Sequence, residues 1–408
     1  MTFPVDDIRS AFPILTDGRR KKPFRYFDSA CVTLRPQAVV DAIGEYYGRF
    51  PGCHGRTVHD LGRLVTDRYD EAHQAACDLI NARSRRDVVF VRNATEGINA
   101  VCHGLDLKPG DVVYSSDIEH NSNLLPWQDG ARRNLFDFRI FRTHDDSTFD
   151  AEAFRRDFPA NCRLVTIHST SNVTGASFPV DEIVRISHER GAPVLVDAAQ
   201  SMVTGPPDVR RPGIDFLVFS AHKMFGPSGL GVLYVAPDHQ DGLRPLLLGG
   251  ETVTDTTYGD HTPAAWPDRL EAGLQNYAGA CGFTAAVAFL RRLDRPALKA
   301  HLTALNGRLS EAVGSIPGVR ILGPADPADR PTVLSLVADG IDPHRLATLL
   351  DDAAGIMVRS GMHCCHSWFH GRNIPESVRF SFSAYNTHEE VEAAVEMLDS
   401  LLRHFRRR

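Results

Sequence analysis

The segment from Val194 to Val235 constrains the fold and the chemistry of this chain more than any other. Two short apolar runs in it, Val194–Val196 and Phe216–Phe219, are each typical of a buried β-strand. The first run ends in Asp197, and the second leads within four residues to Lys223. Ligands of open α/β sheets bind at the carboxyl ends of the strands, so this acid and this lysine are expected to share one site.

An acid and a lysine at neighbouring strand ends are what a pyridoxal phosphate enzyme requires. The lysine binds the cofactor's aldehyde, and the carboxylate keeps the pyridine nitrogen protonated so that the ring accepts the electrons of a carbanion. Taken alone, Asp197 is more often a cap and Lys223 more often a solvated side chain. The context favours the site, because Gln200 can reach a ring substituent while Ser220 and His222 surround the lysine with polar groups.

These residues, in DAAQ and SAHKMFGPSGLGVLYV, resemble the class V aminotransferase group of fold-type I pyridoxal phosphate enzymes. The rest of the chain, from about Val5 to about Arg403, is similar to the group II, Suf-type cysteine desulfurases. The matching segments follow the family's order: YFDSA (26–30), FVRNATEGINAV (90–101), EHNSNLLPWQ (119–128), HSTSNVTG (168–175), RSGMHCC (359–365) and SAYNTHEE (383–390).

Composition excludes several classes of protein. A chain of 408 residues is long for one core and suits two domains. A net charge of −6 gives no sign of a nucleic-acid surface, and no apolar run is long enough to predict a membrane span. The first residues lack the features of a signal peptide, and eight cysteines are too sparse for a disulfide framework, so we expect free thiols in a reducing cytoplasm.

Strand-like runs alternate with helix-like stretches, which favours a doubly wound, mostly parallel α/β sheet with helices on both faces. The expected strands are Asp87–Val91, Asp111–Ser115, Arg163–His168, Val194–Asp197, Phe216–Ser220 and Gly231–Val235. The predicted organisation is an N-terminal segment (1–20) that the family packs on the small domain, a large cofactor-binding domain (21–285) and a smaller α+β domain (286–408) with the cysteine loop.

The segment Leu243–Glu271 interrupts this pattern, because it is rich in Thr, Pro and Gly and poor in helix formers. A disordered loop is one interpretation of such a composition. The resemblance implies another, a β-hook that packs on the partner subunit near its active site. The segment has too few apolar residues for a core of its own, so we expect a homodimer.

A second group of reactive side chains surrounds Cys364, within the segment Arg359–His366. A zinc site is disfavoured, since four consecutive ligands cannot easily surround one tetrahedral ion. A buried structural thiol fits poorly in so polar a segment, whereas a nucleophilic thiolate near Arg359 and histidines fits better. The family motif R-x-G-x-H-C implies that Cys364 forms the persulfide. Cys365 replaces a small residue of the family; packing is favoured, and a resolving or second sulfur-carrying role stays open.

The remaining site residues follow from matching motifs. The resemblance implies that His120 stacks on the cofactor ring and assists proton transfer. It also implies that Asn172 contacts the cofactor's phenolic oxygen or the substrate carboxylate, and that Arg379 binds that carboxylate, with Arg359 as a second substrate residue. From the residues themselves, a helix beginning near Ala94 and Thr95 presents free amide groups that favour a phosphate.

Two segments depart from the family. The family's Gly-Thr pair, which reaches the phosphate of the neighbouring subunit, is here Gly273 and Leu274, and Leu274 cannot donate that hydrogen bond. Gln275 is the nearest residue that could compensate. The family's N-V-H-R-G stretch is replaced by residues 52–59, in which the order of His and Gly differs.

The resemblance implies a desulfurase that converts L-cysteine to L-alanine, forms a persulfide on Cys364 and passes the sulfur to an acceptor protein. A selenocysteine lyase or a carbon–sulfur β-lyase on the same scaffold is the nearest alternative. An aminotransferase does not need Cys364, and a non-catalytic scaffold does not need Lys223, Asp197 and His120. Iron–sulfur cluster assembly and a specialised biosynthetic pathway both stay open, and no metal or membrane partner is expected.

Overall fold

The computed structural model describes residues 3–19, 22–55 and 57–406. Residues 1, 2 and 20 of the predicted N-terminal segment therefore lie outside the described part of the chain. Within that part, no helix is long and apolar enough to cross a membrane.

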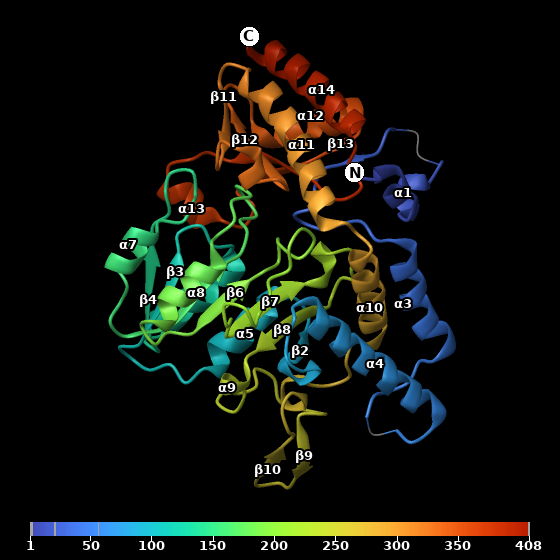
Figure 1. The fold of residues 1–408 in the computed structure, drawn as a ribbon, viewed down its shortest axis with the longest axis vertical. Helices are drawn as coiled ribbons and strands as arrows, with labels where there is room; N and C mark the ends of the chain where they lie inside the picture. The colour runs from blue at the N-terminus through green and yellow to red at the C-terminus, as the bar shows by residue number, and fades with distance from the viewer. Residues whose placement is uncertain (1–2, 20–21, 56, 407–408) are drawn as a thin grey trace.

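A seven-stranded sheet forms the centre of the molecule (Figure 1). Its strand order is β2 (Val88–Val91), β8 (Gly231–Val235), β7 (Phe216–Ser220), β6 (Val194–Asp197), β5 (Cys162–His168), β3 (Val112–Ser116) and β4 (Asp137–Phe141). Neighbouring strands are parallel except that β8 runs antiparallel to both β2 and β7. The predicted fold class is confirmed.

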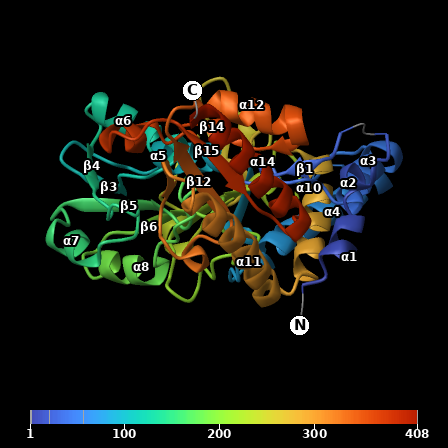
Figure 2. The ribbon, with the colours of Figure 1, turned by 90° about the horizontal axis from the view of Figure 1, so that it is seen from above.

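Most strands of this sheet are buried along their whole length, which explains why continuous apolar runs revealed them. The edge strand β4 escaped the sequence analysis because most of its residues are exposed or half-buried. Helices pack on the sheet and around its ends (Figure 2): α3 (Gln37–Arg49), α4 (Asp60–Leu79), α5 (Ala94–Gly104), α6 (Leu125–Arg132), α7 (Ala151–Arg156), α8 (Val180–His188), α9 (Pro237–Gln240) and α10 (Tyr277–Arg291).

The C-terminal part contains a four-stranded antiparallel sheet in the order β11 (Val319–Leu322), β12 (Val333–Ala338), β15 (Ser377–Ser381) and β14 (Arg359–Gly361). Its helices are α11 (Arg295–Gly314), α12 (Pro343–Ala354), α13 (His366–Gly371) and α14 (His388–Arg406). The expected border between residues 285 and 286 falls inside α10.

The beginning of the chain lies against this C-terminal part (Figure 1). Arg9, in the first helix, forms an ion pair with Glu390 of α14 at 2.7 Å. The N-terminal elements are α1 (Val5–Ser10), α2 (Pro13–Thr16) and β1 (Arg25–Tyr26), which pairs in parallel with β13 (Ile356–Met357). Segments more than 300 residues apart in sequence are thereby joined.

The segment Leu243–Glu271 contains a hairpin of β9 (Val253–Thr256) and β10 (His261–Pro263). The hairpin projects from the end of the molecule opposite the C-terminal part (Figure 1). Almost all of its strand residues are exposed, and so is Tyr258 in the turn between the strands. The segment, called the hook below, therefore contains regular β-structure.

Candidate active site

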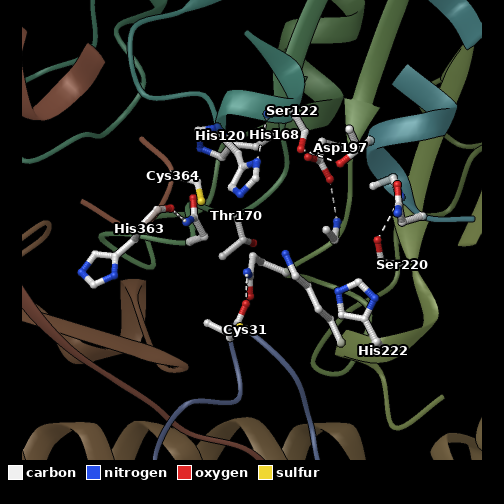
Figure 3. A pocket seen from close by; sticks show the side chains of 18 of the residues that line it. Cys31, His120, Ser122, His168, Thr170, Asp197, Ser220, His222, His363 and Cys364 are labelled. Carbon is white, nitrogen blue, oxygen red and sulfur yellow. Dashed lines mark hydrogen bonds between the residues drawn. The ribbon is translucent and has the colours of Figure 1, made fainter. Parts of the chain in front are cut away.

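A cavity of about 230 Å³ opens where strands β5, β6 and β7 end (Figure 3). The C-terminal part closes its other side with the β14 strand and the cysteine loop that follows. Every site residue expected from the sequence lines this cavity: Ala94, Thr95, His120, Asn172, Asp197, Gln200, Ser220, His222, Lys223, Arg359, Cys364 and Arg379. The tertiary structure therefore brings together residues from across the chain.

Lys223 and Asp197 occupy the floor of the cavity. Asp197 ends strand β6, is buried, and accepts a hydrogen bond from the backbone N–H of Ala199 at 2.9 Å. Lys223 follows β7 in a short 3₁₀ turn, Ala221–Lys223. Burial lowers the pKa of Lys223, which Asp197 opposes, and burial raises the pKa of Asp197, which Lys223 opposes. The acid and the amine therefore act on one another across the cavity.

One end of the cavity is built to bind an anion. Helix α5 begins there, and Asn93 caps it by accepting a hydrogen bond from the N–H of Glu96 at 3.0 Å. Ser220 accepts a hydrogen bond from the N–H of Ala94 at 2.9 Å, and the Thr95 hydroxyl lies 2.6 Å from the hydroxyl of Ser122. Hydroxyls and a helix N-terminus together suit a phosphate group.

His120 enters the cavity as a neutral imidazole with a defined tautomer. Its Nδ1 accepts a hydrogen bond from the backbone N–H of Ser122 at 3.0 Å, so the ring proton resides on Nε2. Burial, and then the nearby Lys223, lowers the pKa of His120 to about 3. Near neutral pH the ring is therefore uncharged and holds one transferable proton.

Two arginines stand side by side on adjacent strands, because Arg359 of β14 pairs directly with Arg379 of β15. Arg379 is buried and donates hydrogen bonds to Asp28 at 3.1 Å and to the carbonyl of Asn172 at 2.9 Å. Arg359 is half-exposed and lies 3.9 Å from the same Asp28. One carboxylate shared by two guanidinium groups leaves excess positive charge to bind a substrate carboxylate.

The loop that carries Cys364 has an unusual backbone. His363 and Cys364 have φ angles of 50° and 59°, in the left-handed region that residues other than glycine seldom adopt. Hydrogen bonds hold the loop on both sides: Asn121 N–H donates to the Cys364 carbonyl at 2.7 Å, and the Asn172 amide donates to the His363 carbonyl at 2.7 Å. These hydrogen bonds therefore hold Cys364 at the cavity wall in a strained backbone conformation.

His363 is the residue that precedes Cys364. It turns its ring away from the cavity (Figure 3), and its Nε2 lies 2.8 Å from the hydroxyl of Ser377. Burial lowers the pKa of His363 to about 2, so this ring adds no positive charge beside Cys364 near neutral pH.

Cys365 is buried, and burial raises the pKa of its thiol. Its Sγ donates to Oδ1 of Asn172 at 3.2 Å. This supports packing as its role. The amide group of Asn172 is thus engaged on both sides of the cysteine loop, and the amide group of Gln200 donates to the carbonyl of Ala30 at 2.9 Å.

The residues that the sequence analysis did not single out include Cys31 and His168, which line the cavity, and Asp28, which contacts Arg379. The imidazole Nδ1 of His168 lies 2.8 Å from Oε1 of buried Glu119, while its buried Nε2 has no partner in the part of the chain that the structure describes. His168 also pairs with Asp197 across strands β5 and β6. The segments YFDSA and HSTSNVTG contain Asp28 and His168, but nothing in their local pattern distinguished these side chains.

The residues present fit pyridoxal phosphate. An amine, a carboxylate on the adjacent strand, and an anion-binding helix N-terminus surround one cavity. Among the residues that line it, His168 and Arg379 each have a buried polar atom, Nε2 and Nε, without a partner among the described residues. Over residues 3–19, 22–55 and 57–406, no group of three or more His, Cys, Asp or Glu side chains is arranged to hold a metal ion.

Comparisons with known proteins agree with this geometry. Residues 25–394 match the aminotransferase class-V family. The chain belongs to this family of fold-type I pyridoxal phosphate enzymes. A probable cysteine desulfurase of Vibrio cholerae is 35% identical over 97% of this chain and 98% of its own length. The apo structure of a cysteine desulfurase from Thermococcus onnurineus has a TM-score of 0.93 and 32% identity, with 99% of each chain covered.

A second solved class-V structure, a cysteine desulfurase from Escherichia coli, has a TM-score of 0.90 and 30% identity over 99% of each chain. The departure from the family at Leu274 is visible in the structure. Leu274 is exposed, and the Gln275 amide donates to the Glu271 carbonyl at 2.5 Å and the Gly273 carbonyl at 3.1 Å. Gln275 is thus engaged within its own turn.

Proposed function

We propose that the protein is a cysteine desulfurase of the Suf-type group, which converts L-cysteine to L-alanine and retains the sulfur as a persulfide on Cys364. The observation that carries this proposal is one cavity lined by both Lys223 and Cys364. An aminotransferase requires the lysine, but its reaction does not require a protein thiol such as Cys364 near the substrate. The hairpin of β9 and β10 supports the Suf-type assignment.

Bound pyridoxal phosphate supplies an electron sink for the carbanion at the substrate Cα. Lys223 would hold its aldehyde carbon, and Asp197 would accept the hydrogen bond of the protonated ring nitrogen. The α5 N-terminus, with Ser220, Thr95 and His222, would bind the phosphate. Ala94, His120 and Gln200 would line the ring.

Substrate binding rests on the paired arginines. Arg379 would bind the carboxylate of L-cysteine, with Arg359 beside it, and Asn172 would hold the wall between the substrate and the cysteine loop. The Lys223 amine would take the Cα proton, and its lowered pKa favours the uncharged form that a base requires. The chain thereby provides both a clamp and a base.

Sulfur transfer then belongs to Cys364. Its sulfur attacks the substrate sulfur, a sulfur–sulfur bond forms, and the carbon–sulfur bond breaks. His120 donates a proton from Nε2 at this stage, because its Nδ1 already accepts a hydrogen bond. The net reaction is L-cysteine plus the Cys364 thiol giving L-alanine plus the Cys364 persulfide. An acceptor protein then collects the outer sulfur.

We further propose the domain organisation and assembly expected from the sequence. Residues 21–285 form the cofactor-binding domain, and residues 286–408 form the small domain on which the first residues pack. Two copies form a homodimer, in which the hook of each subunit contacts the other. Supporting this, the hook and its flanks expose Leu247, Leu248, Tyr258 and Leu274.

Product analysis after incubation with L-cysteine tests the proposed activity. We expect alanine and a 32 Da increase on the peptide that contains Cys364, with no persulfide in Cys364→Ser. Cys365→Ser should retain a sizeable fraction of the activity. Pyruvate with ammonia would instead identify a β-lyase, and an exchange of the two mutant phenotypes would overturn the assignment of Cys364.

A further inference from the structure

Cys31 is a thiol of the active-site cavity that the proposed reaction does not use. It follows strand β1 directly after the YFDSA segment and is a free, partly exposed cysteine. It lines the same cavity as Lys223 and Cys364, and Figure 3 shows Cys31 and Cys364 on two walls of that space. The cavity therefore contains two thiols supplied by opposite ends of the chain.

The surroundings of Cys31 suit a reactive sulfur. Nη1 of Arg359 donates a hydrogen bond to its Sγ at 2.9 Å. Arg359 lies on β14, five residues before Cys364, so a single short segment contacts one thiol and carries the other. Lys223 lines the same cavity as both thiols.

The cavity that Cys31 lines also contains a hydrogen-bond donor without a partner among the described residues. Arg379 is 2% exposed and lines the cavity, and its Nε has no partner among the described residues. A buried donor of this kind calls for a ligand, because leaving it unpaired costs free energy. Anionic sulfur or a carboxylate would satisfy it.

Cys364 lies between the active-site cavity and a groove on the protein surface. Besides the cavity, it lines an outer groove of about 500 Å³ formed with Asn99, His103, Leu125 and Asp129. Its left-handed backbone is strained, and strain of this kind is typical of segments that adopt a second conformation. A persulfide on Cys364 is accessible from this groove, whereas Cys31 lines the cavity and not the groove.

We propose that Cys31 is a second sulfur-carrying residue, which takes the outer sulfur of the Cys364 persulfide and stores it inside the cavity. This rests on the proposed desulfurase activity. The Cys31 sulfur attacks the outer sulfur of the Cys364 persulfide, so one sulfur–sulfur bond forms and one breaks. The Cys31 proton passes to the Cys364 thiolate. The step consumes no oxidant or reductant, and Cys364 regains its thiol for a second L-cysteine.

Cys365, the other candidate for a second carrier, is unsuited to it. Its thiol is 1% exposed, donates to Asn172, and is absent from the lining of the cavity and of the outer groove. Burial raises its pKa, which disfavours the thiolate that sulfur exchange requires. Cys365, next to Cys364 in sequence, therefore has a packing role. Cys31, which lies 333 positions before Cys364, is the candidate for the second carrier.

Peptide mapping of the cofactor-loaded enzyme tests the relay. The enzyme is incubated with excess L-cysteine without acceptor or reductant, alkylated at several times, and digested. We expect the persulfide first on the Cys364 peptide and later on the Cys31 peptide, with about two alanines released per subunit. Cys31→Ser should stop near one alanine, a twofold loss. Cys281→Ser, a matched change at a partly exposed cysteine outside the cavity, should stay at two.

The Cys364→Ser variant decides the direction of transfer. We expect its Cys31 peptide to remain unmodified, because Cys31 receives sulfur only from Cys364. A persulfide on Cys31 in this variant would overturn the relay, as would a wild-type enzyme that loads Cys364 and leaves Cys31 unmodified. A protein that forms neither alanine nor any persulfide would contradict the proposed function itself.

Discussion

Single residues of the cavity have properties that their burial and their partners create. Lys223 is an amine whose pKa burial lowers, and His120 is an imidazole whose pKa falls to about 3. A lowered pKa favours the uncharged form of each group. Lys223 needs this form to act as a base, and His120 needs it to act as a neutral proton donor. The same chemistry on the protein surface would leave the lysine protonated.

We predict that Lys223→Ala abolishes covalent attachment of pyridoxal phosphate. The reason is that Lys223 is the amine facing Asp197 in the cavity. Borohydride treatment followed by mass spectrometry should show the cofactor adduct on the wild-type Lys223 peptide and no adduct in the variant. Lys299→Ala, a change on helix α11 outside the cavity, serves as the control. An adduct on another lysine of the borohydride-treated wild-type protein would contradict the assignment.

Arg379 should determine affinity for the substrate carboxylate. A lysine in its place keeps the charge but loses the planar pair of donors, and hydrogen bonds to charged groups contribute about 1.5–3 kcal/mol. We therefore expect Arg379→Lys to raise KM for L-cysteine by roughly 10- to 150-fold. Steady-state kinetics measures this effect. Arg359→Lys should have the smaller effect, and a larger effect there would mean that Arg359 is the principal clamp.

Whole elements position these residues through close backbone packing. Strand β8 passes the beginning of α5 at Gly231, where a Cβ atom would lie 2.7 Å from Cα of Asn93 and 2.7 Å from the carbonyl oxygen of Phe219. Neither contact can be relieved by rotating a side chain. Glycine at this position therefore allows the helix N-terminus to reach the cavity.

We predict that Gly231→Ala destabilises the protein by about 1–3 kcal/mol, the usual cost of overpacking. It should also weaken cofactor binding, because the displaced backbone holds Asn93 and Ala94. Urea unfolding and titration of the apoprotein with pyridoxal phosphate measure the two effects. Gly307→Ala is the matched control on helix α11, where the nearest atom is 3.9 Å from the new Cβ. A helical Gly→Ala change there should be neutral or stabilising.

At the scale of the whole molecule, buried histidines couple stability to pH. Burial lowers the pKa of His363 to about 2, against about 6.5 for a free histidine. Below pH 6.5 the unfolded chain binds a proton that the folded state does not, so the free energy of unfolding falls as the pH falls. Above pH 6.5 the residue contributes nothing to this dependence.

We predict a loss of up to about 1.4 kcal/mol per pH unit from His363 between pH 6.5 and 4.5. Urea midpoints at pH 7.5, 6.5, 5.5 and 4.5 measure the slope. His363→Gln keeps a partner for Ser377 and should flatten it. The buried acids with lowered pKa, such as Glu119 and Glu271, lose their contribution mainly below this window. An unchanged slope in His363→Gln would show that the residue titrates normally.

Assembly is the other property of the whole molecule. We predict a homodimer, with a mass by light scattering of twice the 45.0 kDa chain. Leu248→Asp combined with Tyr258→Asp should shift the equilibrium toward monomer, because both exposed apolar side chains lie on the hook or its flank. Ile140→Asp, on the exposed edge strand β4, should leave the dimer intact. A monomeric wild-type protein would refute the proposed assembly.

Most strands of the central sheet, and the residues that end them, were predictable from local sequence patterns. Strands β6 and β7 are buried on both faces and therefore read as continuous apolar runs, which made Asp197 and Lys223 recognisable where those runs stop. Edge strand β4 is largely exposed and gave no comparable signal. Cys364 was also recognisable from the sequence, because its motif is one contiguous segment.

The contacts between side chains far apart in sequence could not be predicted and depend on how the chain folds. Nothing in the sequence around Cys31 marked it as a site residue. Its role is inferred from its hydrogen bond with Arg359, which lies 328 residues later. His168 and Asp28 became site residues through the partners that folding gives them, Glu119 and the paired arginines. Charge, burial and hydrogen bonding between distant segments are not encoded in local periodicity, because they depend on how the sheets and loops pack.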